Sequence, residues 1–329
     1  MSLKRILKYS LLAILLVIVG LIAFNYAPDR SVEDLKEHWT YDNSKFIEID
    51  GIDVHYRING QGFPLVLIHG TGASLHTWER WTDILAKDFQ VISLDMPAFG
   101  LTGPALDRDY SLENYAQFLN TFLGKIGVDS FHLAGNSLGG AISWRYASMF
   151  PEKVEKMILI DASGYPFDKK LPLAFRMAKN DLMGKVLLKI TPKALFWKSI
   201  REVYYNDDLI TEELIDRYYE LYLREGNRQA FVDRVRNIEY NDASPIKTIK
   251  TPTLIMWGAD DEWIPVALAN KFKDDLINAE SIIYKEVGHV PMEEIPEVTA
   301  QDARIFLLKK IEVSLVSNLE NSIENGEDN

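Results

Sequence analysis

The stretch that decides the fold is Phe131-His132-Leu133-Ala134-Gly135-Asn136-Ser137-Leu138-Gly139-Gly140, and a helical pattern of Ala, Ile and Trp follows it to Phe150. Its first four residues form an apolar run that predicts a strand. A serine between two glycines, placed where a strand turns sharply into a helix, is typical of a turn that exposes the serine hydroxyl as a nucleophile. The N-terminus of the following helix stabilises negative charge nearby. The plainer interpretation is a glycine-rich turn that merely joins a strand to a helix.

A serine nucleophile needs a base within hydrogen-bonding reach, and the base is usually histidine. The chain has six histidines, of which five precede Ser137 (His38, His55, His69, His76 and His132). Only His289 follows it, in Val287-Gly288-His289-Val290, and the chain order that accompanies such a turn is serine, acid, histidine. We therefore predict His289 as the base. The other five form no pair four residues apart with an acidic helper, so a metal site is not expected.

The acid that orients the histidine should lie between Ser137 and His289 in the chain. Asp260 and Asp261 fit best, because they follow the apolar run Thr253 to Trp257 through Gly258-Ala259 and so emerge at the carboxyl end of a strand. Asp161, which ends the preceding predicted strand, is the alternative. Its plainer interpretation is a turn or helix cap.

Acyl transfer also needs two backbone N–H donors for the oxyanion. The first is the N–H of Leu138. The second is expected in His69-Gly70-Thr71-Gly72, which follows the apolar run Leu65 to Ile68 and has the small residues that such a loop requires. We predict Thr71 as the second donor and a structural role for His69.

Around these motifs, β-rich runs alternate with amphipathic helical runs, which indicates a mostly parallel sheet with helices on both faces, in the α/β class. We predict eight strands, at Phe46–Ile49, Asp53–Ile58, Leu65–Ile68, Val91–Leu94, Phe131–Ala134, Met157–Ile160, Thr253–Trp257 and Ser281–Tyr284. Residues 45–163 and 250–312 then form the core. Residues 164–249 lack strand signals and predict a helical cap insertion, with helices at Pro192–Tyr205, Glu212–Arg224 and Arg228–Tyr240. Residues 313–329 form an acidic tail.

The N-terminal residues 1–30 contain an uncharged stretch from Tyr9 to Pro28. Twenty residues in a helix rise about 30 Å, enough to cross a membrane, although a signal peptide is the alternative. A poor cleavage site before Pro28 favours an uncleaved signal anchor. Basic residues before the stretch and acidic residues after it predict a cytoplasmic N-terminus and a catalytic domain outside the cytoplasm, periplasmic or extracellular, or secreted if cleavage occurs. Residues 31–44 predict a polar linker, so a chain that begins near Ser31 is expected to be soluble and active.

Composition narrows the function classes. The 329 residues include 36 Lys and Arg against 48 Asp and Glu, a net charge of −12, which disfavours nucleic acid as a partner. Membrane contact is therefore expected to be hydrophobic, through the N-terminal helix. The chain has no cysteine, so disulfides and thiolate metal sites are excluded. No oligomeric state is indicated.

The ordered set of His69-Gly70, Asp95-Met96-Pro97, the Ser137 turn, Gly258-Ala259-Asp260-Asp261 and Gly288-His289 resembles the capped α/β-hydrolase superfamily, in its serine-nucleophile, esterase- or lipase-like branch. The resemblance covers roughly residues 45 to 310 and implies an α/β-hydrolase fold. In that family the acid usually lies three residues after the glycine that ends its strand, which selects Asp261. A serine nucleophile argues against the dehalogenases and epoxide hydrolases of the family.

We expect hydrolysis of small apolar carboxylic esters by Ser137, His289 and Asp261, without a cofactor. The turn around Ser137 also looks like that of meta-cleavage-product hydrolases, which split carbon–carbon bonds in dienol acids. Val290 stands where those enzymes usually carry tryptophan, and Gly72-Ala73-Ser74 replaces their Gly-Pro-Gly. An acid-binding arginine in the cap would distinguish them, and the candidates are Arg176, Arg201 and Arg224. A non-catalytic ligand-binding member of the fold is the third interpretation.

Overall fold

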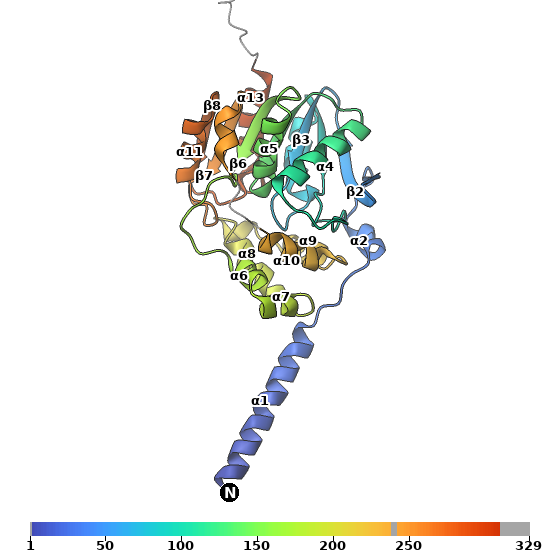
Figure 1. Cartoon of the computed structure of the whole chain (residues 1–329), viewed down its shortest axis with the longest axis vertical. Coiled ribbons are helices and arrows are strands. Elements are labelled where there is room, and N and C mark those ends of the chain that lie inside the picture. Colours follow the sequence, from blue (N-terminus) through green and yellow to red (C-terminus); the bar gives the residue numbers. More distant parts are fainter. Residues whose placement is uncertain (1, 238–241, 310–329) are drawn as a thin grey trace, which may run out of the picture.

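A computed structural model describes residues 2–237 and 242–309 of the chain, and its centre is an eight-stranded sheet (Figure 1). The spatial order is β1-β2-β4-β3-β5-β6-β7-β8; β1 and β2 run antiparallel to their neighbours and all other pairs are parallel. The strands are β1 (Lys45–Ile49), β2 (Ile52–Asn59), β3 (Phe63–Ile68), β4 (Phe89–Leu94), β5 (Phe131–Asn136), β6 (Val154–Ile160), β7 (Thr253–Gly258) and β8 (Ala279–Tyr284). The predicted eight-stranded, mostly parallel sheet is confirmed, and every predicted strand overlaps an observed one.

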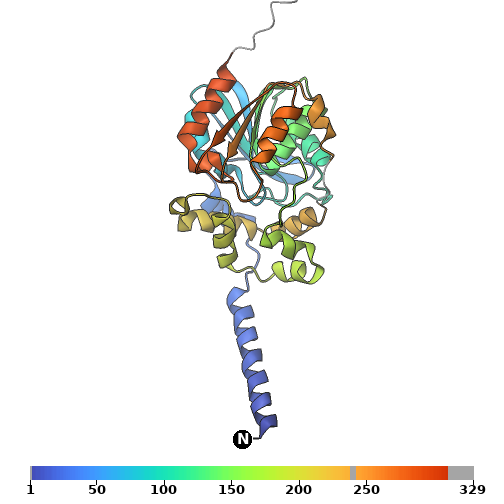
Figure 2. The same cartoon turned by 90° about the vertical axis from the view of Figure 1, so that its left-hand side faces the viewer.

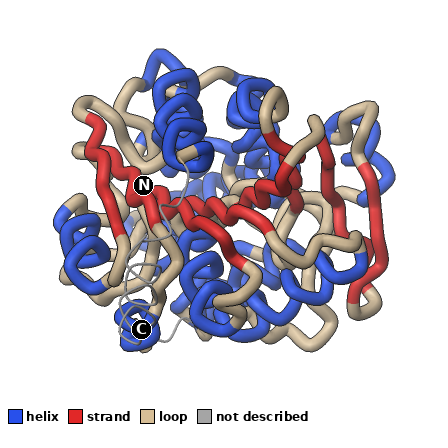
Figure 3. Tube along the Cα trace, turned by 90° about the horizontal axis from the view of Figure 1, so that it is seen from above, coloured by secondary structure: helices blue, strands red, loops and turns tan. Residues whose placement is uncertain are grey.

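Helices cover both faces of this sheet (Figure 3). Side chains of β3 show why its sequence is a bare apolar run: Val66 and Ile68 join the core on one face, and Leu65 and Leu67 join the core on the other. One face carries α4 (Leu112–Lys125), α5 (Leu138–Met149) and α11 (Ala267–Asp275); the other carries α3 (Glu79–Leu85) and α13 (Pro296–Leu308). The short helices η1 (Leu75–Trp78), η3 (Ser244–Thr248) and α12 (Pro291–Glu294) complete the core.

Residues 164–249, called the cap here, are inserted between β6 and β7 and are helical in their described part. The helices are α6 (Leu173–Lys179), α7 (Asp181–Leu187), α8 (Lys193–Arg201), η2 (Asp207–Leu209), α9 (Glu212–Tyr222) and α10 (Asn227–Arg236). The last three α-helices match predicted ones, whereas α6 and α7 are too short and too irregular in pattern to have been predicted. The predicted end of α10 at Tyr240 and the predicted tail at 313–329 lie outside the described residues.

The N-terminal helix α1 (Leu3–Asn25) projects from the cap side of the molecule, away from the sheet (Figures 1 and 2). Its mean hydropathy reaches 2.6 over 18 residues, and none of that stretch is buried in the protein. By length and composition it could cross a membrane or serve as a signal sequence.

The segment after α1 is not the free linker that the sequence suggested for residues 31–44. Ser31 accepts a hydrogen bond from the Asp34 N–H and so caps α2 (Val32–Trp39). Leu35 of this helix is fully buried, and the Trp39 indole donates to Glu220 of the cap over 2.9 Å. The polar composition that predicted a linker is the exposed side of an amphipathic helix with only one buried residue.

The residues between α1 and α2 are also bound to the cap. Arg228 lies on α10 with a side chain only 1% exposed, and it donates to the Ala27 carbonyl and to the Asp29 carboxylate. A chain that begins at Ser31 would leave this buried guanidinium without both partners. We therefore expect that a stable soluble chain has to begin near Asn25 and not at Ser31.

Candidate active site

Ser137 lies between β5 and α5 in a strained backbone conformation, with φ 55° and ψ −114°. A non-glycine residue rarely adopts a positive φ, and such strain persists where the surrounding structure enforces it. Ser137 N–H donates to the Ile160 carbonyl over 2.9 Å, and its own carbonyl accepts from Ser163 N–H over 3.0 Å. A Cβ on Gly135 would collide with the backbone of Gly139, and a Cβ on Gly139 would collide with the Ile68 carbonyl, so the glycines at −2 and +2 are both needed for the turn.

The structure brings His289 and Asp261 together, as the sequence predicted. Nδ1 of His289 lies 2.7 Å from Oδ2 of Asp261, and because a carboxylate only accepts, this ring nitrogen carries the proton. The other oxygen of Asp261 accepts the N–H groups of Trp263 and Ile264, at 2.6 and 2.9 Å. Nε2 of His289 has no hydrogen-bond partner among the described residues. It is therefore free to take a proton from Ser137, which lines the same cavity.

Asp260 and Asp161, the other predicted acids, have different positions. Asp260 is exposed and accepts the Glu286 N–H over 3.0 Å, which braces the loop after β8. Asp161 is fully buried, and one of its oxygens accepts the Gly258 N–H over 3.0 Å. Burial raises the pKa of Asp161 well above its ordinary value, and the neighbouring Asp261 carboxylate raises it further. Asp161 is thus kept protonated beside Asp261.

Within residues 2–237 and 242–309, one group of side chains has ligand atoms close enough to hold a metal ion. The group is Asp161, Asp261 and His289, and one ligand atom from each lies within 4.8 Å of the others. A metal would have to displace the 2.7 Å bond between Asp261 and His289. We interpret the cluster as a histidine, its orienting carboxylate and a neutral second acid.

Both predicted oxyanion donors lie beside Ser137. Leu138 is the first residue of α5, and Thr71 follows β3 and lines the cavity. His69 braces this loop: its Nδ1 donates to the Gly70 carbonyl over 2.8 Å, and its Nε2 accepts the Met96 N–H over 3.0 Å. Burial lowers the pKa of His69, which keeps the ring neutral for these two roles.

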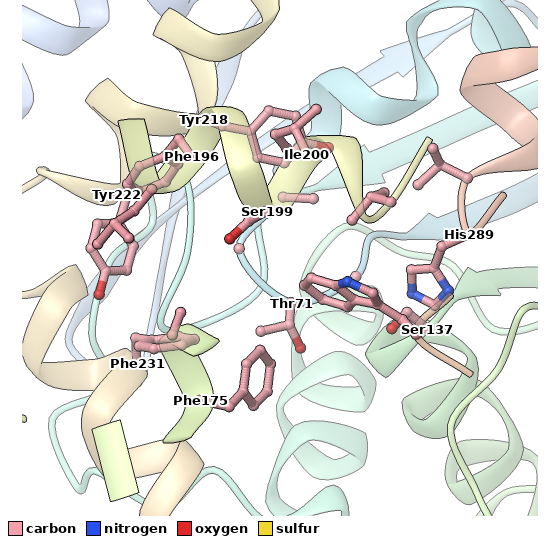
Figure 4. Close-up of a pocket in the computed structure, with 18 of the residues that line it drawn as sticks. Thr71, Ser137, Phe175, Phe196, Ser199, Ile200, Tyr218, Tyr222, Phe231 and His289 are labelled. Atoms are coloured by element: carbon pink, nitrogen blue, oxygen red, sulfur yellow. The ribbon is translucent and has the colours of Figure 1, made fainter. Parts of the chain in front are cut away.

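The cavity extends from Ser137 into the cap and encloses about 930 Å³ including its open mouth. In Figure 4, Ser137 and His289 lie together at one end, and Phe196, Tyr222 and Phe231 of the cap lie at the other. Trp263 lines the wall beside His289, with 5.6 Å between the two ring centroids. An apolar cavity with a few polar groups at one end is typical of a small-molecule site.

Three functional neighbours were not predicted. Arg234 of α10 is buried, and its guanidinium donates to Thr71 Oγ1 over 2.7 Å. Trp263 follows Asp261 by two residues, and Glu294 follows His289 by five. The local sequence around Arg234 and Trp263 gives no sign that they lie at the site, because their positions there depend on how the cap packs on the core.

Glu294 joins the cap to the histidine loop. One of its oxygens accepts the N–H groups of Tyr205 and Asn206 in the cap, at 2.9 and 3.1 Å, and the other accepts the Gly288 N–H over 2.6 Å. The His289 N–H also donates to the Val203 carbonyl over 2.7 Å. A carboxylate aimed at three backbone N–H groups makes strong, charge-assisted hydrogen bonds.

Comparison with known proteins agrees with this geometry. A family model described as alpha/beta hydrolase fold matches residues 64–296. Lipase 3 of Moraxella sp. is 30% identical over 255 residues, covering 75% of this chain and 78% of the lipase. The 2-hydroxy-6-oxo-6-(2'-aminophenyl)hexa-2,4-dienoic acid hydrolase of Metapseudomonas resinovorans is 27% identical over 280 residues, covering 82% and 92% of the two chains.

Among solved structures, a membrane phospholipase A described as a bacterial virulence factor is similar over 93% of this chain and 98% of its own, with 28% identity and a TM-score of 0.70. The relatives thus support a hydrolase activity, and they include both lipases and carbon–carbon bond hydrolases. The chain belongs to the α/β-hydrolase family.

Proposed function

We propose that this chain is a serine hydrolase that cleaves carboxylic esters through an acyl-enzyme intermediate. Nε2 of His289 takes the proton of the Ser137 hydroxyl as its oxygen attacks the ester carbonyl carbon. The backbone N–H groups of Thr71 and Leu138 stabilise the oxyanion, and Asp261 stabilises the imidazolium. His289 then protonates the leaving alkoxide. Water, activated by the same imidazole, attacks the acyl carbonyl and releases the acid and free Ser137.

The observation that carries the ester proposal is the composition of the cavity wall. Apart from His289, no acidic or basic side chain lines it among the described residues, and aromatic and aliphatic groups dominate. A dienol acid would need a cation beside its carboxylate, because an unpaired charge is costly to bury.

The three arginines expected to mark a carbon–carbon hydrolase do not line the cavity. Arg176 and Arg201 are exposed, and Arg201 pairs with Asp207 over 3.3 Å. Arg224 donates to the Thr102 carbonyl over 3.2 Å. These positions favour an uncharged substrate.

One observation keeps carbon–carbon bond hydrolysis as the second candidate. Arg234 reaches the oxyanion loop through Thr71, and no carboxylate pairs with it in the described part of the chain. A small shift of Thr71 would present this guanidinium to a substrate acid. The relatives that act on dienoic acids give the same reason to test it.

Membrane anchoring through α1 is part of the proposal. The helix is long and apolar enough to span a bilayer, and it is not used in the protein core. The flanking charges favour an orientation in which the catalytic domain lies outside the cytoplasm. Full-length protein should therefore stay with membranes during high-salt extraction, and a mature chain that begins near Ala27 or Pro28 would instead show cleavage.

The function is tested by labelling the purified chain with a fluorophosphonate and measuring turnover of nitrophenyl esters of increasing acyl length beside a dienol acid. We expect ester turnover and labelling, both abolished by Ser137→Ala with an unchanged circular dichroism spectrum. Preference for the dienol acid would favour the second candidate. A wild-type chain that is neither labelled nor active would indicate a ligand-binding role.

A further inference from the structure

The end of the N-terminal helix and the wall of the active-site cavity meet at one residue. Thr191 lines the cavity, and its N–H donates over 3.2 Å to the carbonyl of Asn25, the last residue of α1. Two residues further along, the Ala27 N–H donates over 3.0 Å to the Lys189 carbonyl. Leu187 and Leu195, on either side of Thr191, line the cavity as well. The cavity therefore reaches the point where α1 would leave the bilayer.

Buried contacts fix this arrangement. Arg228 donates to the Ala27 carbonyl over 2.8 Å and to Asp29 over 2.6 Å, and its guanidinium is shielded from water. Arg30 pairs with Glu220 over 2.9 Å. In both side views the cap lies between α1 and the sheet (Figures 1 and 2). If α1 spans a membrane, the cap is the part of the catalytic domain that faces the bilayer.

The surface of the cap nearest to α1 suits a lipid surface. Leu182 and Met183 of α7 are 68% and 36% exposed, although both are apolar. Lys179 and Lys185 flank them, are exposed, and have no carboxylate partner within the described ranges. Apolar side chains between free lysines are typical of helices that lie at a membrane interface.

The distribution of charge also supports contact between this part of the cap and a membrane. Residues 164–201 contain nine Lys and Arg against two Asp and Glu, a net charge of +7, whereas the whole chain carries −12 and the remainder therefore −19. The basic segment holds α6, α7 and α8. A purely hydrophobic membrane contact was expected from the net charge of the whole chain. That total does not reveal the positive charge of residues 164–201. Lipid phosphates attract this segment, and they repel the acidic remainder of the chain.

We propose that α7 rests in the lipid headgroup region and that the cavity fills from the bilayer, so that the substrates are long-chain acyl esters of membrane lipids. The hydrolysis in this statement rests on the proposed function, whereas the orientation of the cap does not. An acyl chain in the cavity would extend from Leu187 and Thr191 along the aromatic wall toward Ser137. Leu187 and Thr191 are each only 2% exposed, so α7 has to shift to admit the chain at this end.

The orientation is tested by fluorescence, and the absence of cysteine makes single-site labelling straightforward. Full-length Leu182→Cys is labelled with a nitrobenzoxadiazole dye and reconstituted in phosphatidylcholine–phosphatidylglycerol vesicles with a nitroxide-bearing lipid. Ile305→Cys is the matched control, because Ile305 is 57% exposed on α13, which lies at the end of the molecule opposite α1 (Figure 1). We expect at least twofold quenching at position 182 and none at 305. Equal quenching at both positions would overturn the orientation.

Substrate delivery is tested with Leu182→Glu/Met183→Glu in the full chain. Its hydrolysis of a fluorogenic phosphatidylcholine in vesicles should fall at least tenfold, while turnover of soluble nitrophenyl butyrate stays within twofold of wild type. Ile305→Glu should change neither rate. An unchanged lipid rate in the double variant would refute delivery from the bilayer. A wild-type protein that hydrolyses no ester and is not labelled at Ser137 would instead refute the proposed function. The quenching result would still test the orientation of the cap.

Discussion

Replacing Asp261 by Asn is the most decisive perturbation of the site, because both oxygens of this carboxylate are used. One accepts from His289 and the other from the N–H groups of Trp263 and Ile264. An Asn has one oxygen and one NH₂ group, so it satisfies only one side. If its oxygen stays with the two N–H groups, the NH₂ faces Nδ1 of the imidazole. The ring proton must then move to Nε2, and the histidine cannot act as a base.

The structure allows the size of this effect to be worked out. The opposite amide orientation loses two hydrogen bonds of about 1 kcal/mol each, so about 2 kcal/mol favours the inactive tautomer. Only about 3% of molecules then hold a competent base, a loss of about 30-fold. The missing negative charge on the imidazolium contributes further, and the total expected loss in kcat is about 10³ to 10⁴.

The assay compares kcat on a soluble nitrophenyl ester for Asn variants at 261, 260 and 161. The Asp260→Asn variant should stay within about twofold, because Asp260 is exposed and bonds only a loop N–H. The Asp161→Asn variant should lose no more than about tenfold, since Asp161 is already neutral and an amide can keep its bond from Gly258. Near-normal turnover by the Asp261→Asn variant, with collapse at 161 or 260, would show that the reasoning is wrong.

Three further predictions concern the rest of the molecule. A chain that begins at Asn25 should be soluble and as stable as the full protein. A chain that begins at Ser31 should lose about 3 kcal/mol in urea unfolding, because Arg228 loses the Ala27 carbonyl and the Asp29 carboxylate and keeps only Thr191 Oγ1; equal stabilities would contradict this. Burial raises the pKa of Asp95, but interaction with His55, whose Nδ1 lies 2.9 Å from Oδ2 of Asp95, lowers it to about 2. Stability should therefore fall as the pH drops from about 4 to about 2 and hold above; a flat urea midpoint over that range would count against it. The Arg234→Met variant should lower kcat about tenfold with little change in KM, because its charge supports the oxyanion loop; a change in KM alone would indicate a substrate contact instead.

Much of the fold could be predicted because its signals are local. Leu65–Ile68 of β3 is a bare apolar run, and it supplies side chains to both faces of the sheet. The placement of Ser137 and His289 at one end of the cavity also follows from short motifs at strand ends. The resemblance to a known family then selected Asp261 over Asp260, and the structure places Asp261 beside the imidazole.

The features that escaped prediction depend on contacts between distant segments. Helix α2 has a single buried residue, Leu35, so its pattern was too weak to be recognised. In the sequence, Arg228 is only one more charged residue of a predicted helix. Its role becomes clear in the structure, where residues 27–29 pack against it. Arg234 lies 163 residues after Thr71, and no spacing rule connects them.

The bonds that tie the cap to the histidine loop also restrict how the site can open. Separating the cap from the core at residues 203–206 would break the bond from His289 N–H to Val203 and the two N–H bonds to Glu294, at a cost of about 4 kcal/mol. A Cβ on Gly288 would collide with the Val203 carbonyl, so the two backbones are in direct contact there. Opening at this side would displace the imidazole. Substrate entry and product release should therefore move α6 and α7 instead. His289 would then keep its position relative to Ser137 while substrate enters and product leaves.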